Sequence, residues 1–369
     1  MFIYLCFIGI LFFQWMIFSK KKKNNISSPT KYKNRKIFII LVCIELICLA
    51  GLRDTHIGAD TRVYVQALEY YKLFPHDEIL KAKLVYPYDF EIGYFLLTKV
   101  CAYFSLNSTE FLFLIAIIIY VPICKFILQY SENPYISILT YFAFGYFGYS
   151  LGIFRQMIAL SIVLSGFKFI QERKLIKYII VIVIAMLFHT TAIIMLPLYW
   201  ISNIKIKNKL KYIFVLEIIV LATSRKIILL IFKIFPRYII YLNSIYDIQD
   251  GSYSMLILLN FILIVGYYII YKQNEKQNEK QNEILNICIN AIVISIILQI
   301  LGYSMEIFGR IVPYYSIYLV VLIPALLNRQ KLIKDRVLIH FIISILLISL
   351  FYYLTNGRIA LCPYSFIWQ

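Results

Sequence analysis

One arginine stands between two apolar runs of the sequence, in the segment Gly152-Ile153-Phe154-Arg155-Gln156. A charge inside a bilayer costs a few kcal/mol, so its presence in such a place needs a reason. Arg155 could lie at a membrane interface, with its side chain extended toward water. Alternatively, its planar guanidinium matches the oxygens of a phosphate group and could hold one there.

Two further residues resemble Arg155 in being polar groups at interruptions of apolar runs. Arg310 lies at the end of one such run, with Glu306 one helical turn before it. A structural salt bridge and a phosphate clamp are both consistent with that pair. His189 lies in the polar patch 188–191 and is either a packing residue or a functional group. Its position at an expected break favours function.

A compact polar turn, Arg53 to Thr61, follows directly after an apolar run. Asp60 or Thr61 could cap a helix that begins near Arg62. Alternatively, the Asp60 carboxylate could activate a sugar hydroxyl, and Arg53 could hold a diphosphate. The four histidines have no paired spacing, which argues against a metal site. We expect neither a metal nor another cofactor.

The composition indicates which elements must position these residues. The chain has 369 residues, of which 62% are apolar and 15% charged, and its mean hydropathy is +0.79. Soluble domains are about half apolar and a quarter charged. Roughly 20 residues cross a bilayer once. The sequence therefore predicts an all-α polytopic integral membrane protein with about ten to twelve transmembrane helices. They would form one transmembrane domain over residues 1–369, without a separate soluble catalytic domain.

The distribution of charge sets the predicted topology. The net charge of +18 is explained by short cytoplasmic loops, because such loops are rich in Lys and Arg, and no nucleic-acid partner is expected. Residues 20–36 hold eight basic and no acidic residues, so they should lie inside and both termini outside. Segment 53–89 is predicted to be an external loop. Segment 225–250, with basic residues on one helical face, is predicted to be an external amphipathic segment.

Two apolar runs do not fit a simple crossing. The run near 90–105 would begin and end outside, which favours an interfacial or re-entrant helix. The run near 175–200 lies between two basic clusters that both prefer the cytoplasm, so we expect a broken helical hairpin that bends at 188–191. This topology gathers most of the unusual polar residues on the outer side. Glu45 and Glu217 lie within spans, where the sequence offers no obvious partner.

Several short motifs together resemble the EpsG family of polysaccharide-polymerase-like membrane proteins, over nearly the whole chain. The motifs are Gly152-Ile153-Phe154-Arg155-Gln156-x-x-Ala159, Ala185-x-x-Phe188-His189-x-x-Ala192, Arg53 with Gly58-x-Asp60-Thr61-x-x-Tyr64, Phe90-Glu91-x-Gly93-Tyr94, Arg310 before Tyr314-Tyr315, and Pro363-Tyr364. The family often has Pro after the Glu of the Glu-x-Gly element, where this chain has Ile92.

The resemblance implies a Wzy-like role. Such a protein would join polyprenyl-diphosphate-linked oligosaccharide units at the outer face of the bacterial cytoplasmic membrane, into a capsule, O-antigen or exopolysaccharide. A chain-length regulator and a flippase of the same pathway are the partners that it suggests. The expected catalytic residues are Arg155, Asp60, Glu91 and His189, and the expected substrate-binding residues are Arg53, Gln156, Arg310 and Tyr64. Arg155 and Arg310 would hold the diphosphate, and Asp60, with Glu91 or His189, would act on the acceptor.

Three other functions remain open from the sequence. An O-antigen-ligase-like glycosyltransferase would use a similar site but make a single addition. A flippase or transporter of lipid-linked oligosaccharide predicts charged residues along a path open to both sides, whereas here they gather on one side. A structural member of an export complex would tolerate substitution at Arg155 and His189.

Overall fold

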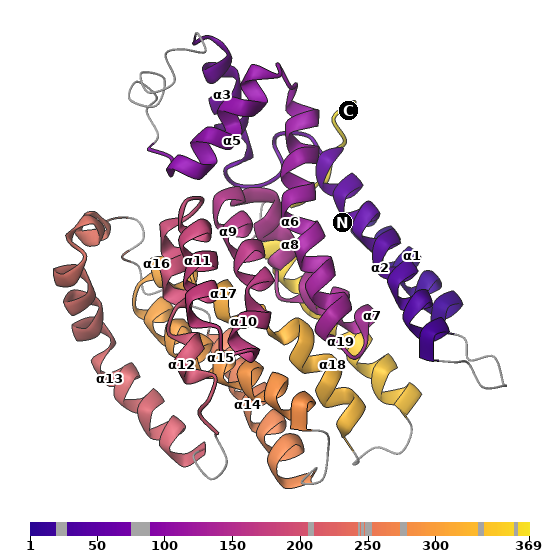
Figure 1. Cartoon of the computed structure of the whole chain (residues 1–369), viewed down its shortest axis with the longest axis vertical. Helices are drawn as coiled ribbons and strands as arrows, with labels where there is room; N and C mark the ends of the chain where they lie inside the picture. The colour runs from indigo at the N-terminus through magenta and orange to yellow at the C-terminus, as the bar shows by residue number, and fades with distance from the viewer. Residues whose placement is uncertain are drawn as a thin grey trace. The chain divides into compact units, whose positions relative to one another are not determined.

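The chain folds as an assembly of helices (Figure 1). The computed structural model describes residues 1–19, 28–74, 89–205, 210–242, 244, 247, 253–273, 279–330, 336–357 and 361–369. No strand occurs in these ranges. Five of their helices are long and apolar enough to cross a membrane: Phe2–Ser19, Ser108–Tyr130, Tyr253–Ile270, Asn282–Ser304 and Val337–Thr355. The predicted all-α polytopic membrane class is thus confirmed, while the side on which each terminus lies stays a prediction.

The candidate spans are fewer than the ten to twelve predicted. A bent helix pair, Glu306–Ser316 with Leu319–Arg329, raises the number in the described ranges to six if it counts as one span. Glycines divide other apolar runs into pieces that are too short to cross alone, since a helix rises 1.5 Å per residue. Gly145, with φ of 77°, separates α7 (Pro134–Ala143) from α8 (Tyr146–Gly152). Gly166 separates α9 (Phe154–Ser165) from α10 (Phe167–Gln171).

The second irregular run bends as predicted, whereas the interfacial or re-entrant placement of the first stays a prediction. The first is α5 (Ile92–Tyr103), whose 12 residues extend about 18 Å, well short of a bilayer core. The second folds back on itself. Its α11 (Leu175–Met186) ends just before His189, whose backbone is extended, and η2 (Thr190–Met195) then returns alongside α11. The Tyr178 hydroxyl donates to the Met195 carbonyl at 2.7 Å and so holds the two arms together.

The predicted external loop 53–89 contains a helix, α3 (Thr61–Lys72). Residues 75–88 of that loop lie outside the described ranges. The buried ammonium of Lys99, on α5, donates to the carbonyls of Tyr71 and Phe74 at 3.0 Å each. Carbonyls at the end of a helix have no partner within it. Lys99 therefore joins the end of α3 to α5 and fixes the packing of these two helices.

One predicted boundary is wrong. Segment 225–250 was predicted to be a separate external amphipathic segment, but α13 (Leu210–Ile234) begins before Arg225 and runs past it. The helix continues because it contains neither Gly nor Pro. It ends just before Pro236, which begins η3 (Pro236–Tyr241).

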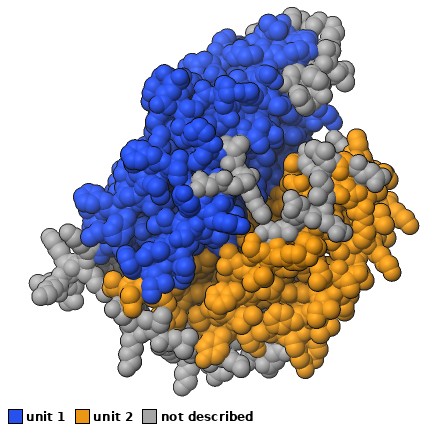
Figure 2. All heavy atoms as spheres, turned by 180° about the vertical axis from the view of Figure 1, so that it is seen from behind, with its two compact units in different colours: residues 1–196, 340–369 blue, residues 197–339 orange. Residues whose placement is uncertain are grey.

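The chain forms two compact units, which Figure 2 distinguishes by colour. Unit 1 comprises residues 1–196 and 340–369, and unit 2 comprises residues 197–339. The remaining helices of unit 1 are α1 (Phe2–Ser19), α2 (Ser28–Gly51), α6 (Ser108–Tyr130) and most of α19 (Arg336–Gly357). The remaining helices of unit 2 are α12 (Leu198–Ile201), α14 (Tyr253–Tyr267), α15 (Glu279–Ser304), α16 (Glu306–Gly309), α17 (Pro313–Ser316) and α18 (Leu319–Arg329).

Both glutamates that the sequence placed within spans have partners that it did not indicate. Glu45 accepts a hydrogen bond from Gln14, which joins α2 to α1. Glu217, on α13, shares a side-chain hydrogen bond with Asn260 on α14. Polar pairs of this kind join helices that have no hydrophobic force between them in a bilayer. We therefore assign both glutamates to helix packing.

Candidate active site

Three separate segments bring their polar residues together in unit 1. Glu91 immediately precedes α5, Arg155 is the second residue of α9, and His189 immediately precedes η2. The close packing of the start of α5 against the bend at His189 depends on Gly93, whose N–H donates to the Leu187 carbonyl at 2.8 Å. A Cβ atom at Gly93 would lie 2.7 Å from that carbonyl oxygen. The absence of a side chain at Gly93 thus lets the start of α5 pack against the bend that holds His189.

The Glu91 carboxylate is the centre of the site. One oxygen, Oε2, lies 2.5 Å from Nη1 of Arg155. The other oxygen, Oε1, lies 3.0 Å from Nδ1 of His189 and 3.3 Å from the backbone nitrogen of Thr190. Only 13% of the Glu91 side chain is exposed, against 25% for Arg155 and 22% for His189. The site is thus recessed, but both basic groups remain accessible.

Glu91 is ionised at neutral pH. Burial favours the neutral acid and would raise its pKa, but the hydrogen bond with His189 and the charge of Arg155 outweigh burial and lower the pKa to about 2. Glu91 lies outside the candidate spans. Because an ionised carboxylate only accepts hydrogen bonds, Nδ1 of His189 carries the proton of this hydrogen bond. In a neutral imidazole with that tautomer, Nε2 would be the proton acceptor.

Aromatic rings surround Arg155. Its guanidinium lies 5.0 Å from the centre of the Phe90 ring, within the range of a cation–π interaction. The Tyr64 hydroxyl shares a hydrogen bond with Arg155, and the Tyr64 ring stacks on Phe154 at 4.7 Å. Burial raises the pKa of Tyr64 to about 12, so this phenol is neutral at physiological pH. The buried Nε of Arg155 has no hydrogen-bond partner within the described ranges.

Asp60 lies beside this cluster. It precedes α3, which begins at Thr61 and not at Arg62, and its side chain makes no capping hydrogen bond. Thr61 does not cap the helix either, because its hydroxyl donates to the carbonyls of Ile57 and Leu151 at 2.8 Å each. Asp60 thus occupies the position before the helix, but neither side chain caps it. The Asp60 carboxylate is close enough to Tyr64 to contribute to the raised pKa of that phenol.

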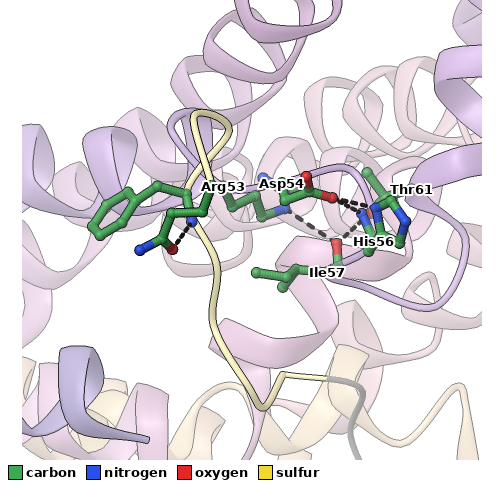
Figure 3. A network of polar contacts seen from close by, with 7 residues as sticks. Arg53, Asp54, His56, Ile57 and Thr61 are labelled. Atoms are coloured by element: carbon green, nitrogen blue, oxygen red, sulfur yellow. Dashed lines mark hydrogen bonds and ion pairs between the residues drawn. The ribbon is translucent and has the colours of Figure 1, made fainter.

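The other three predicted site residues, Arg53, Gln156 and Arg310, are not part of the cluster around Glu91. Arg53 is only 1% exposed, and its guanidinium donates to backbone carbonyls (Figure 3). Gln156 is buried within α9 and has a polar interaction inside the protein. Arg310 belongs to unit 2, where it follows α16. A Cβ at Gly302 of α15 would lie 2.8 Å from the Gly309 nitrogen, so this glycine permits the close packing of α16.

The sequence did not assign roles to Phe90, Phe154 or the Thr190 amide. A signal for the two rings was present, because each directly precedes a charged residue of the site, in Phe90-Glu91 and Phe154-Arg155. The contact of the amide with Glu91 could not have been found, since it depends on packing between separate segments. No group of three or more His, Cys, Asp or Glu side chains within the described ranges is placed to hold a metal ion.

The fold and the site define a class: a multi-pass helical membrane protein with a recessed Arg–Glu–His cluster beside a neutral tyrosine. The chain belongs to the EpsG family, whose model matches residues 36–366, nearly the whole sequence. Members of this family are Wzy-like polymerases, so the chain is a polysaccharide-polymerase-like membrane protein. Comparisons with curated proteins and with solved structures find no match.

Proposed function

We propose that this protein is a glycosyltransferase that polymerises polyprenyl-diphosphate-linked oligosaccharide units into a surface polysaccharide. The reaction would take place at the outer face of the bacterial cytoplasmic membrane. The observation that carries the proposal is the Glu91 carboxylate, which bridges Arg155 and His189. This one group places a phosphate-binding cation and a proton acceptor side by side. The transfer of a glycosyl group from a diphosphate to a hydroxyl needs both.

The proposed step balances without a nucleotide sugar. The hydroxyl oxygen at the non-reducing end of the acceptor unit attacks the anomeric carbon of the donor chain, and a glycosidic C–O bond forms. The bond between that carbon and the diphosphate oxygen breaks, and its electron pair leaves with the polyprenyl diphosphate. The hydroxyl proton passes to Nε2 of His189. The high glycosyl-transfer potential of the polyprenyl-diphosphate donor drives the reaction.

Each residue of the cluster has a role in this proposal. Arg155 stabilises the negative charge that develops on the leaving diphosphate. His189 is the general base, and Glu91 holds its tautomer and orientation. Asp60 is the carboxylate on the acceptor side, next to Tyr64.

Reconstitution tests the proposal. The purified protein is placed in liposomes with the host's own lipid-linked repeat unit and no nucleotide sugar, and the products are separated by gel electrophoresis. We expect a ladder of multiples of the repeat unit. A single added unit would instead indicate a ligase. Movement of the unit to the opposite leaflet, without a change in its length, would indicate a flippase.

A matched pair of variants connects the ladder to the site. Arg155→Lys retains the charge but loses the planar fork, and we expect it to abolish the ladder. Arg35→Lys is the control. Arg35 lies outside the Glu91 cluster, where its Nη2 donates to the carbonyls of Ile127, Leu128 and Ser131 at the end of α6. A ladder that survives Arg155→Lys would contradict the assignment of the diphosphate to this residue.

A further inference from the structure

Arg53 is a buried cation whose hydrogen bonds go to backbone carbonyls. Its side chain is 1% exposed. Nε donates to the Ile57 carbonyl at 3.3 Å, Nη2 donates to the Leu151 carbonyl at 2.9 Å, and Nη1 donates to the Ala50 carbonyl. Figure 3 shows the bond to Ile57 within the polar turn. Because the three nitrogens are used in this way and the side chain is buried, Arg53 has no accessible surface for a substrate.

The acceptors explain why a charge is tolerated there. Ala50 lies at the end of α2 and Leu151 at the end of α8, where helix carbonyls lack partners within the helix. A helix C-terminus also carries about half a negative charge, which a nearby cation stabilises. Arg53 thus lies between two helix C-termini and holds them together. The lysine side chain has a single nitrogen and no planar fork, so it could not reach all three carbonyls.

Two glycines bring the turn against the end of α8. Gly58 has φ of +96°, and a Cβ atom there would lie 2.1 Å from the Leu151 oxygen. On the other side, a Cβ at Gly152 would lie 2.8 Å from the Ala59 nitrogen. The Thr61 hydroxyl adds a second bond to the Leu151 oxygen, at 2.8 Å. The turn and the end of α8 therefore have one fixed relative position.

This contact lies directly before Arg155. The α8 helix ends at Gly152, and α9 begins at Phe154. The Phe154 ring contacts the Arg53 guanidinium, 5.5 Å from its centre, and also the Tyr64 ring. The orientation of the first turn of α9 is thus fixed by Arg53 and Tyr64 together.

The C-terminal tail, residues 361–369, holds the turn from another direction. Arg53 pairs with Phe366 in an antiparallel bridge. The amide of Asp54 donates to the Ser365 carbonyl at 2.9 Å, and the amide of Ile367 donates to the Leu52 carbonyl at 3.0 Å. The turn is therefore held both by the end of α8 and by the tail.

We propose that Arg53 is a positioning residue, which acts with Thr61 and the C-terminal tail to orient Arg155 toward the diphosphate. It does not contact the substrate. The sequence suggested a substrate-binding role for Arg53, and the inference replaces that role. It rests on the proposed function for its effect on turnover, but its structural part can be measured without any substrate.

The test uses two variants with matched controls. Arg53→Lys removes the fork, and Arg35→Lys makes the same change at the end of α6. Thr61→Val removes one hydroxyl, and Thr140→Val removes a buried hydroxyl that bonds only to the Ile136 carbonyl of its own helix. Thr61→Ser restores the hydroxyl. If Arg53→Lys does not fold, the threonine series carries the test alone.

The first readout needs no substrate. Thermal unfolding is followed from pH 7 to pH 1.5 for each protein and for a second protein that also carries Glu91→Gln. The pH range in which the two unfolding curves converge reports the pKa of Glu91 in the folded protein. We expect this pH to rise in Arg53→Lys and Thr61→Val, because a displaced Arg155 stabilises the carboxylate less. The pH of convergence should stay unchanged in the two control variants. In Thr61→Ser it should equal that of the unaltered protein. An unchanged pH in both test variants would overturn the inference.

The second readout is steady-state polymerisation. A displacement of about 1 Å can cost about 100-fold in rate. We expect kcat to fall about 10- to 100-fold in Arg53→Lys and less in Thr61→Val, with KM for the lipid-linked unit within about 2-fold. A raised KM with unchanged kcat would show that Arg53 binds substrate and would overturn the inference. If the pH readout shifts but the unaltered protein makes no polymer, the positioning role stands and the proposed function fails.

Discussion

Nη1 of Arg155 lies 2.5 Å from Oε2 of Glu91, a residue 64 positions earlier in the chain. The second carboxylate oxygen is held by His189, so Glu91 completes a unit of three side chains from three segments. Groups that act as a unit lose their function together. In this account the Glu91 carboxylate, and not the arginine alone, makes the site suited to a diphosphate donor and a hydroxyl acceptor.

The Glu91 ion pair should stabilise the protein over a defined range of pH. The described charged and titratable groups that face Glu91 are Arg155, His189 and Tyr64. Because the pKa of Glu91 falls to about 2 on folding, its contribution is full above about pH 4.5 and is lost as the pH falls toward 2. The difference in Tm between the unaltered protein and Glu91→Gln should therefore be constant from pH 7 to 5 and shrink below that.

The control for this prediction is Glu69→Gln. Glu69 forms an exposed pair with Lys72 at 2.8 Å, and exposed pairs of this kind contribute little to stability. Its Tm difference should be small at every pH. A Glu91→Gln difference as small as that of Glu69→Gln at neutral pH would mean that the carboxylate is not held as described.

His189→Asn separates proton transfer from structure. The Asn amide can still donate to Glu91, but it cannot accept the acceptor's proton at neutral pH. We expect kcat to fall about 100- to 10,000-fold, with KM and Tm close to those of the unaltered protein. His340→Asn, on α19, should leave the rate unchanged. Normal turnover in His189→Asn would rule out His189 as the base.

Gly58→Ala should destabilise the protein. The residue has φ of +96°, and the added Cβ would lie 2.1 Å from the Leu151 oxygen. We expect a loss of about 2 kcal/mol or more in the free energy of unfolding. Gly9→Ala, in a helix with nothing within 4 Å of the new Cβ, should be neutral or stabilising by up to about 1 kcal/mol. Denaturant unfolding in detergent measures both, and equal effects would contradict the described packing.

The sequence predicted the helical membrane class because composition alone fixes it. It also predicted the bend at His189, because two basic clusters cannot lie on opposite sides of one crossing. It could not show that Arg53 is buried, since an arginine that donates to backbone carbonyls has the same sequence pattern as one that binds phosphate. The described ranges hold fewer candidate spans than predicted, because a glycine such as Gly145 divides an apolar run without lowering its hydropathy. The Glu91–Arg155 pair depends on packing across separate segments, which no local pattern contains.

The Gln14–Glu45 pair gives a test of the packing of α1 and α2. A single Gln14→Leu change leaves a buried carboxyl group without its partner and should cost about 1–3 kcal/mol. Gln14→Leu combined with Glu45→Leu removes both polar groups and should cost much less. A double-mutant cycle of unfolding measures this difference. Strictly additive effects would show that the two side chains do not meet.

The most direct test of the central claim is the release of polyprenyl diphosphate in reconstituted liposomes, measured together with polymer length. The account predicts one polyprenyl diphosphate released for each linkage formed, by the unaltered protein and by Arg35→Lys. It predicts a fall of about 100- to 1,000-fold in both quantities for Arg155→Lys, with the substrate still bound. Release and polymer length that remain normal in Arg155→Lys would contradict the account.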